Sequence, residues 1–116
     1  MKKLLVLYPR PVDEDGFLTY YREVHLPKAL ELPGLLSASY SVTNDEGAPF
    51  FVYFEAAFRN GPALERAMSS DVGIFLAGDI GNFSPKGAVT VVSDTDILKP
   101  LVVTPERLSA GDDNEL

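Results

Sequence analysis

The chain has 116 residues, 46% of them apolar, which fits a single domain with a hydrophobic core of its own. It contains no Cys, which excludes disulfides and thiolate chemistry and suits a reducing cytosol, so we expect a cytoplasmic protein. A formal net charge of −7 disfavours nucleic acid and anionic membranes as partners, and no stretch approaches the roughly 20 apolar residues of a membrane span.

The N-terminal segment predicts a strand that is buried on both sides. Residues 4–8 are apolar throughout, whereas a strand with one face in water alternates apolar and polar residues. Two lysines before this run also resemble the start of a signal peptide. The run is too short for one, however, and Pro9 ends it, so we interpret it as the first strand of the mature protein.

The next segment predicts a helix that changes or ends near His25. The acidic residues 13–15 suit a first helical turn, where the helix dipole is positive. Pro27 cannot continue an ordinary helix without loss of a hydrogen bond, so the helix either ends near His25 or restarts with Pro27 in its first turn. Four residues at helical spacing predict a buried stripe: Phe17, Tyr20, Tyr21 and Val24.

A hairpin, a second helical region and a last strand follow. Residues 35–43 alternate between apolar residues and serines, residues 50–58 are apolar on both faces, and turn-forming residues 44–49 join them. Asn60 suits a helix N-cap, and the sequence Ser69-Ser70-Asp71 could cap a further helix that ends at Gly81. A loop over residues 82–87 then leads to a strand over residues 88–92.

The order β-α-β-β-α-β predicts a ferredoxin-like α+β fold, in which a four-stranded antiparallel sheet carries both helices on one face. The other face would be wet in a monomer, yet the first and third strands are apolar on both sides. A second copy of the chain is the simplest cover for that face, so we expect a homodimer.

Several short motifs resemble the EthD-like family of the dimeric α+β barrel superfamily. They lie in the predicted first strand, the first helix and the end of the second helical region: Tyr8-Pro9, Tyr20-Tyr21, His25-Leu26-Pro27, Pro33-Gly34 and Asp79-Ile80-Gly81-Asn82-Phe83. We therefore expect an EthD-like domain over residues 1–93. Residues 94–116 then form a C-terminal arm and a disordered acidic tail.

The resemblance implies a dimeric α+β barrel with a pocket in each subunit. Family members are associated with ether degradation, and the superfamily includes cofactor-free monooxygenases, decarboxylases and isomerases, so the shared fold does not fix one activity. A single His and no Cys argue against a structural zinc site, and no Gly-rich loop suits a dinucleotide. We expect no cofactor and no metal.

His25 is the only histidine and the first candidate for catalysis. It follows Tyr21 by one helical turn, at the edge of the predicted stripe, so its ring could touch both a buried pocket and water. Its unperturbed pKa suits proton transfer near neutrality. The alternative is a structural histidine that bonds a backbone carbonyl where the helix breaks.

The other candidates surround His25 in the predicted fold. Tyr21 is a second catalytic candidate because it could position His25, although tyrosines at this spacing are more often packed in the core. Glu55 could orient His25 or act as a base, or it could pair with an arginine or lysine at an edge, for which Arg22 or Arg59 could serve. The residues proposed to bind substrate are Tyr20, Tyr40, Tyr53, Glu55, Asn82 and Phe83.

Three functions remain open at this point. The first is an enzyme that uses His25 as a general acid or base on a small hydrophobic organic molecule, in an oxidation, a decarboxylation or an isomerisation. The second is a non-catalytic protein that binds such a molecule or assists a neighbouring enzyme. The third is a dimeric domain without a cavity beside His25.

Overall fold

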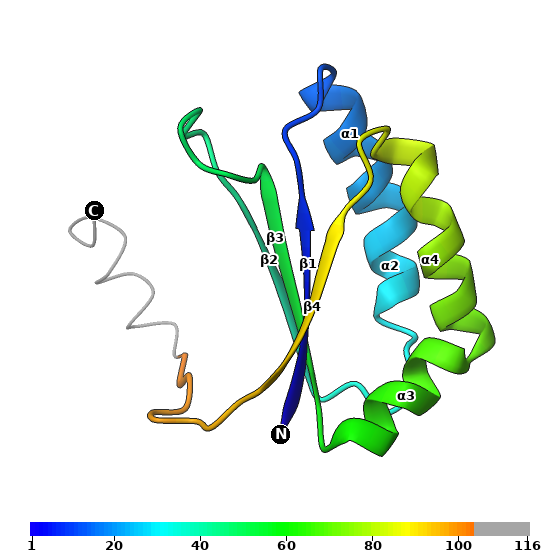
Figure 1. Cartoon of the computed structure of the whole chain (residues 1–116), viewed down its shortest axis with the longest axis vertical. Coiled ribbons are helices and arrows are strands. Elements are labelled where there is room, and N and C mark those ends of the chain that lie inside the picture. The colour runs from blue at the N-terminus through cyan, green and yellow to red at the C-terminus, as the bar shows by residue number, and fades with distance from the viewer. Residues whose placement is uncertain (104–116) are drawn as a thin grey trace.

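The protein consists of one antiparallel sheet with helices on one face (Figure 1). The structure is a computed structural model that describes residues 1–103. The strands lie in the order β2-β3-β1-β4, and each pairs antiparallel with its neighbours: β1 (Lys2–Tyr8), β2 (Ser37–Val42), β3 (Val52–Phe58) and β4 (Val89–Asp94). The predicted ferredoxin-like α+β fold is therefore confirmed.

The helices cover the same face of the sheet in two stretches. The first runs without a break through α1 (Glu14–Tyr20), the π-helical turn η1 (Tyr21–His25) and α2 (Leu26–Ala29). The second comprises α3 (Gly61–Ser69) and α4 (Asp71–Phe83). Side chains of Asn60 and Ser70 accept hydrogen bonds at the starts of α3 and α4, as the sequence predicts.

Aromatic side chains fix the place where β1, the first helical stretch and α4 meet. The ring of Tyr8, at the end of β1, lies 5.6 Å from Phe17, 5.4 Å from Tyr21 and 5.5 Å from Phe83, measured between ring centroids. Each such pair stabilises the fold by about 0.5–1.5 kcal/mol beyond simple burial. This aromatic cluster holds the two helical stretches in fixed positions against the sheet.

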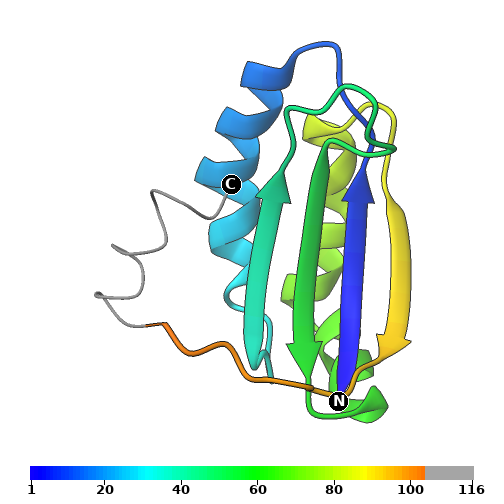
Figure 2. The ribbon, with the colours of Figure 1, turned by 90° about the vertical axis from the view of Figure 1, so that its left-hand side faces the viewer.

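The opposite face of the sheet carries no helix in the described part of the chain (Figure 2). The strand register places Leu7 of β1 between Tyr53 and Val89, and Leu5 between Glu55 and Val91, on this open face. Both valines are more than 40% exposed in the isolated chain. The open face is thus largely apolar, as predicted, except for the charged pair of Lys3 in β1 and Glu55 in β3, and no helix within residues 1–103 covers it.

Of the two alternatives for the first helix, an end near His25 is wrong and a restart at Pro27 agrees with the structure. The wide turn η1 leads directly into α2, which has Pro27 in its first turn. The same wide turn rotates Val24 out of the buried stripe, and its side chain is exposed.

The second helical region also ends later than predicted. Helix α4 continues through Gly81 to Phe83, where the Ser84 N–H donates to the Ile80 carbonyl at 2.8 Å. The helix ends at this point because Pro85 follows Ser84, and the residue before a proline disfavours helical backbone angles. Asn82 is thus helical, and no residue other than glycine has a positive φ within residues 1–103.

The segment after β4 runs past the lower ends of the strands in Figure 2. Its first contact is a hydrogen bond from the Thr95 N–H to the Met1 carbonyl at 2.9 Å. The division of the chain at residue 93 stays a prediction, and the expected disorder of residues 109–116 lies outside the described residues. No helix within residues 1–103 has the length and apolar character needed to cross a membrane.

Candidate functional site

His25 lies at the end of the π-helical turn, on the side of the helix that faces the sheet. An α-helical path would bring the Pro27 ring against the carbonyl of Glu23, four residues earlier. The chain widens instead, and the Leu26 N–H donates to the Tyr21 carbonyl, five residues back. The His25 ring stacks on the Tyr21 ring at 5.6 Å and is only 5% exposed. Such turns are frequent at functional sites.

Asp79 of α4 is the partner of His25. Its Oδ2 lies 2.9 Å from His25 Nδ1. Its Oδ1 accepts hydrogen bonds from the Tyr20 hydroxyl at 2.6 Å and from Asn82 Nδ2 at 2.9 Å. Asp79 is only 3% exposed, so a buried carboxylate is held by three side chains from two helical stretches.

Hydrogen bonding determines the ionisation of Asp79 and the tautomer of His25. Burial alone would raise the pKa of Asp79, but the hydrogen bonds from Tyr20, Asn82 and His25 outweigh it and lower that pKa. An ionised carboxylate only accepts hydrogen bonds, so His25 Nδ1 carries the proton and donates it to Asp79. The other ring nitrogen, Nε2, then holds the free lone pair, and it has no hydrogen-bond partner within residues 1–103.

The pKa of His25 is lowered, because burial disfavours the imidazolium more than Asp79 stabilises it. At neutral pH the ring is therefore uncharged, with a basic Nε2. The nearby carboxylate would stabilise the positive charge that appears when Nε2 takes up a proton. This combination suits a general base.

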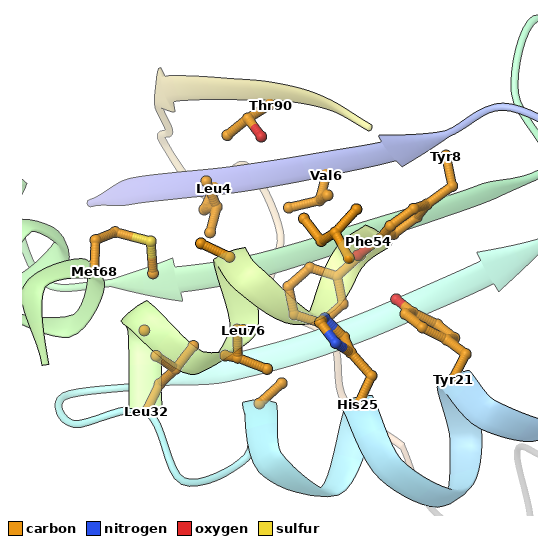
Figure 3. A pocket seen from close by; sticks show the side chains of 14 residues that line it. Leu4, Val6, Tyr8, Tyr21, His25, Leu32, Phe54, Met68, Leu76 and Thr90 are labelled. Atoms are coloured by element: carbon orange, nitrogen blue, oxygen red, sulfur yellow. The ribbon is translucent and has the colours of Figure 1, made fainter. Parts of the chain in front are cut away.

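A cavity of about 110 Å³ lies between the sheet and the helices and is lined in part by His25 (Figure 3). Most of its lining is aliphatic or aromatic, including Leu4, Val6 and Leu76. The polar side chains that line it are Tyr8, Tyr21, His25 and Thr90. A cavity of this size and character accommodates a small apolar molecule, about as large as benzene.

The structure brings four of the predicted site residues to His25. Tyr20 and Asn82 bind Asp79, and Tyr21 stacks on the His25 ring. Phe83 is buried with its ring centroid 4.7 Å from that of His25, but like Tyr20 and Asn82 it does not line the cavity.

Tyr40 lies at the edge of this group. Its ring meets the Tyr21 ring edge to face at 5.7 Å, and its hydroxyl accepts a hydrogen bond from Arg22 Nε at 2.9 Å. It does not line the cavity.

Two predicted residues lie on the open face of the sheet, away from His25. The Tyr53 hydroxyl accepts a hydrogen bond from the Phe50 N–H at 3.3 Å. Glu55 pairs with Lys3 at 3.3 Å, a lysine as the alternative allowed, and not with Arg22 or Arg59. The suggestion that Glu55 orients His25 is wrong, because alternate residues of a strand point to opposite faces and Glu55 follows the inward-facing Phe54.

The sequence reasoning missed Asp79 and Tyr8 as site residues. Asp79 is the only charged residue of α4 after its first turn, in an otherwise apolar and small-residue sequence. A lone carboxylate on such a helix needs a buried partner, and that was the available signal. Tyr8 ends an apolar strand, and only the packing of β1 against η1 shows that it lines the cavity with His25.

No cluster of three His, Cys, Asp or Glu side chains suited to a metal ion occurs in residues 1–103. The donors to Asp79 are the neutral side chains of Tyr20, Asn82 and His25, so His25 and Asp79 form a proton-transfer pair without a metal.

Comparison with known proteins gives similarity at the level of structure. No protein-family model and no curated protein matches the sequence. An EthD family protein from Bacillus halodurans has a TM-score of 0.77 and 24% identity, over 83% of this chain and 99% of that chain. This chain shares its fold with an EthD family protein.

Two further structures carry the same fold. One is described as an antibiotic biosynthesis monooxygenase, with a TM-score of 0.59 and 21% identity over 84% of this chain and 100% of that one. The other is a dimeric ferredoxin-like protein of unknown function from Thermobifida fusca, with a TM-score of 0.66 and 8% identity over 81% and 90%. At such identities these likenesses establish the fold.

Proposed function

We propose that the protein is an enzyme that removes a proton from a small, largely apolar organic molecule, with Nε2 of His25 as the general base. The observation that carries the proposal is the 2.9 Å contact between His25 Nδ1 and the buried carboxylate of Asp79. It fixes the tautomer that leaves Nε2 basic, on a side chain that lines the cavity. Asp79 acts as a positioning residue.

Isomerisation is the reaction class that a general base in a mainly apolar cavity supports best. The base takes a proton from one atom of the substrate and returns it to another, so protons and electrons balance without a further reactant. An oxidation would need dioxygen as the electron acceptor. The fold shared with a protein described as a monooxygenase keeps oxidation as the next candidate.

Nitroethane provides a test of the base that does not require the natural substrate, because it is small and its C–H bond is acidic. In D₂O, nuclear magnetic resonance should show exchange of this proton catalysed by the wild-type protein. His25→Ala should lower the catalysed rate about 100-fold or more, as expected for loss of a general base. Asp79→Asn should also lower it, because an amide can hold the ring in the wrong tautomer.

Glu55→Gln is the matched control, since it neutralises a carboxylate on the open face and should leave the exchange rate unchanged. Circular dichroism verifies that each variant is folded. Equal rates for wild type and His25→Ala would overturn the proposal.

A non-catalytic binding protein is the second candidate, and the small, mainly apolar cavity favours it. In that case His25→Ala would bind small apolar molecules as well as the wild type does, and neither would accelerate exchange. The presence of a cavity beside His25 argues against the third hypothesis, a domain whose interior is filled by side chains.

We also propose that the chain forms a homodimer through the open face of the sheet. The exposed apolar residues of this face support the proposal, as does the shared fold with a protein described as dimeric. Val91→Asp would bury an unpaired charge in such an interface, so light scattering at micromolar concentration should show a dimer for wild type and a monomer for this variant.

Val92→Asp is the matched control for the dimer. Val92 is the next residue of β4, is 51% exposed and points to the other side of the sheet. This variant should remain dimeric. A monomeric wild type, or a dimeric Val91→Asp variant, would contradict the proposed interface.

A further inference from the structure

The hydroxyl of Tyr21 is buried close to the Tyr8 hydroxyl, and it forms no hydrogen bond of good geometry within residues 1–103. Tyr21 is 0% exposed, and its hydroxyl is the one side-chain nitrogen or oxygen of these residues that is both shut off completely from solvent and unpaired. Buried polar groups are nearly always paired, because an unpaired one has lost its water without compensation. Tyr21 lines the cavity beside His25, so a molecule in the cavity can supply the missing partner.

Tyr8 places a second hydroxyl in the same wall. Its ring packs edge to face on Tyr21, and Figure 3 shows both hydroxyl groups and the His25 ring directed toward one region of the cavity. Burial raises the pKa of Tyr8 and of Tyr21 far above neutrality. Both side chains therefore keep their protons and act as hydrogen-bond donors.

The charges around the cavity restrict the ligand further. No Lys or Arg of residues 1–103 lines it, and the carboxylate of Asp79 lies 2.9 Å from Nδ1 of the His25 ring. An anionic ligand would lose its water and meet a negative charge without a cation to compensate. The ligand that fits is neutral, small and apolar apart from one oxygen that accepts hydrogen bonds.

We infer that the cavity takes a small neutral carbonyl compound whose oxygen accepts hydrogen bonds from the hydroxyls of Tyr21 and Tyr8. A carbonyl oxygen has two lone pairs and no proton of its own, which matches two converging donors. The inference rests on the proposed function of His25 and names the substrate class of that site.

The carbonyl group also gives the base a proton to remove. When Nε2 of His25 takes a proton from the carbon beside the carbonyl, the electron pair of the C–H bond forms a C=C bond. The carbonyl π pair moves to the oxygen, which becomes an enolate that the two hydroxyls stabilise. Where a further C=C bond is conjugated with the enolate, return of the proton from His25 to the far carbon of the extended enolate shifts the double bond and restores the carbonyl group. The product is an isomer, and no oxidant or reductant takes part.

The test compares cyclopentanone with methylenecyclopentane, which has the same shape but a CH₂ group in place of the oxygen. Titrations followed by nuclear magnetic resonance give both dissociation constants. The wild type should bind cyclopentanone at least about tenfold more tightly, as one or two added hydrogen bonds allow. The C=O stretching band of bound cyclopentanone should lie at lower wavenumber than in an apolar solvent.

Tyr21→Phe should remove most of this preference and return the C=O band toward its position in the apolar solvent, and Tyr8→Phe should do so in part. Tyr53→Phe, on the open face, is the matched control. It should keep both the preference for cyclopentanone and the lowered C=O band. Thermal unfolding verifies that the variants fold. A preference that persists in Tyr21→Phe, or wild-type protein that binds the two probes equally, would overturn the inference.

His25→Ala separates this inference from the proposed function. If both hold, this variant keeps the preference for cyclopentanone and loses nitroethane exchange. Exchange that is equal in wild type and His25→Ala, with the preference intact, rejects the base and supports the carbonyl site. Exchange that depends on His25, without a preference for cyclopentanone, supports the base and rejects the carbonyl site.

Discussion

Two pairs of side chains that can bear opposite charges, one between the helices above the covered face of the sheet and one on its open face, differ chiefly in burial. His25 and Asp79 lie 2.9 Å apart with side chains 7% and 1% exposed. Lys3 and Glu55 lie 3.3 Å apart on the open face, with side chains 28% and 44% exposed. Water screens the second pair in the isolated chain, and pairs of that kind stabilise a protein by about 0–1 kcal/mol.

Burial makes the first pair both costly and useful. A buried carboxylate must be fully hydrogen-bonded, and Asp79 has three donors around it. Those donors fix its charge and, through it, the tautomer of His25. The difference between the faces shows that a carboxylate gains a chemical role here from its surroundings, and not from its mere presence near a polar partner.

The largest expected difference between the two pairs is in the loss of stability when Asp79 or Glu55 is replaced by alanine. Asp79→Ala leaves His25, Tyr20 and Asn82 without their common acceptor, so the free energy of unfolding should fall by about 3 kcal/mol or more. Glu55→Ala should change it by less than about 1 kcal/mol. Urea unfolding measures both values, and similar losses for the two variants would show that burial does not distinguish the pairs.

A fall in pH should act on the buried pair through His25. Burial lowers the pKa of folded His25 below its ordinary value of 6.5, so the fold favours the neutral ring. The corresponding stability is present above pH 6.5 and is lost as pH falls through the lower pKa of the folded state. The lowered pKa of Asp79 adds a second loss, which begins only below its ordinary value of 3.8.

Unfolding in urea between pH 7.5 and pH 5 measures the first of these losses. His25→Gln has no imidazole to protonate, so its stability should depend less on pH over this range than that of the wild type. An identical pH dependence in both proteins would assign the loss to other groups.

The smallest effect concerns the hydroxyls of two tyrosines. Tyr21→Phe removes a buried hydroxyl that has no partner, so it should leave the protein equally stable or stabilise it by up to about 1 kcal/mol. Tyr53→Phe loses the hydrogen bond from the Phe50 N–H and should destabilise slightly. Chemical unfolding of the two variants side by side gives the sign, and a marked loss in Tyr21→Phe would indicate a partner for its hydroxyl.

Strand and helix positions could be predicted because local patterns determine them. Apolar runs, turn residues and the N-cap residues Asn60 and Ser70 carry their signals within a few neighbouring residues. The π-helical turn was harder to predict. Pro27 indicates a disturbance, but whether the helix stops or widens depends on the packing of Tyr21 and His25 against β1 and α4.

The candidate site was also predictable only in part. His25, Tyr20, Tyr21 and Phe83 could be selected from helical spacing and the motifs that resemble the EthD-like family, and they do come together. Glu55 could not be placed, because a carboxylate in an apolar strand gives no sign of which face is covered. Asp79 carried a signal in its apolar helix, yet its pairing with His25 spans 54 positions of sequence.

The sequence by itself determined the α+β class, the order of the elements and the two-sided apolar character of β1 and β3, since each follows from local composition and periodicity. Only the tertiary structure decided that Asp79 is the partner of His25, that Tyr8 and Tyr21 share a cavity with it, and that Glu55 lies on the other face. These are contacts between distant segments, and they depend on how the helices pack against the sheet.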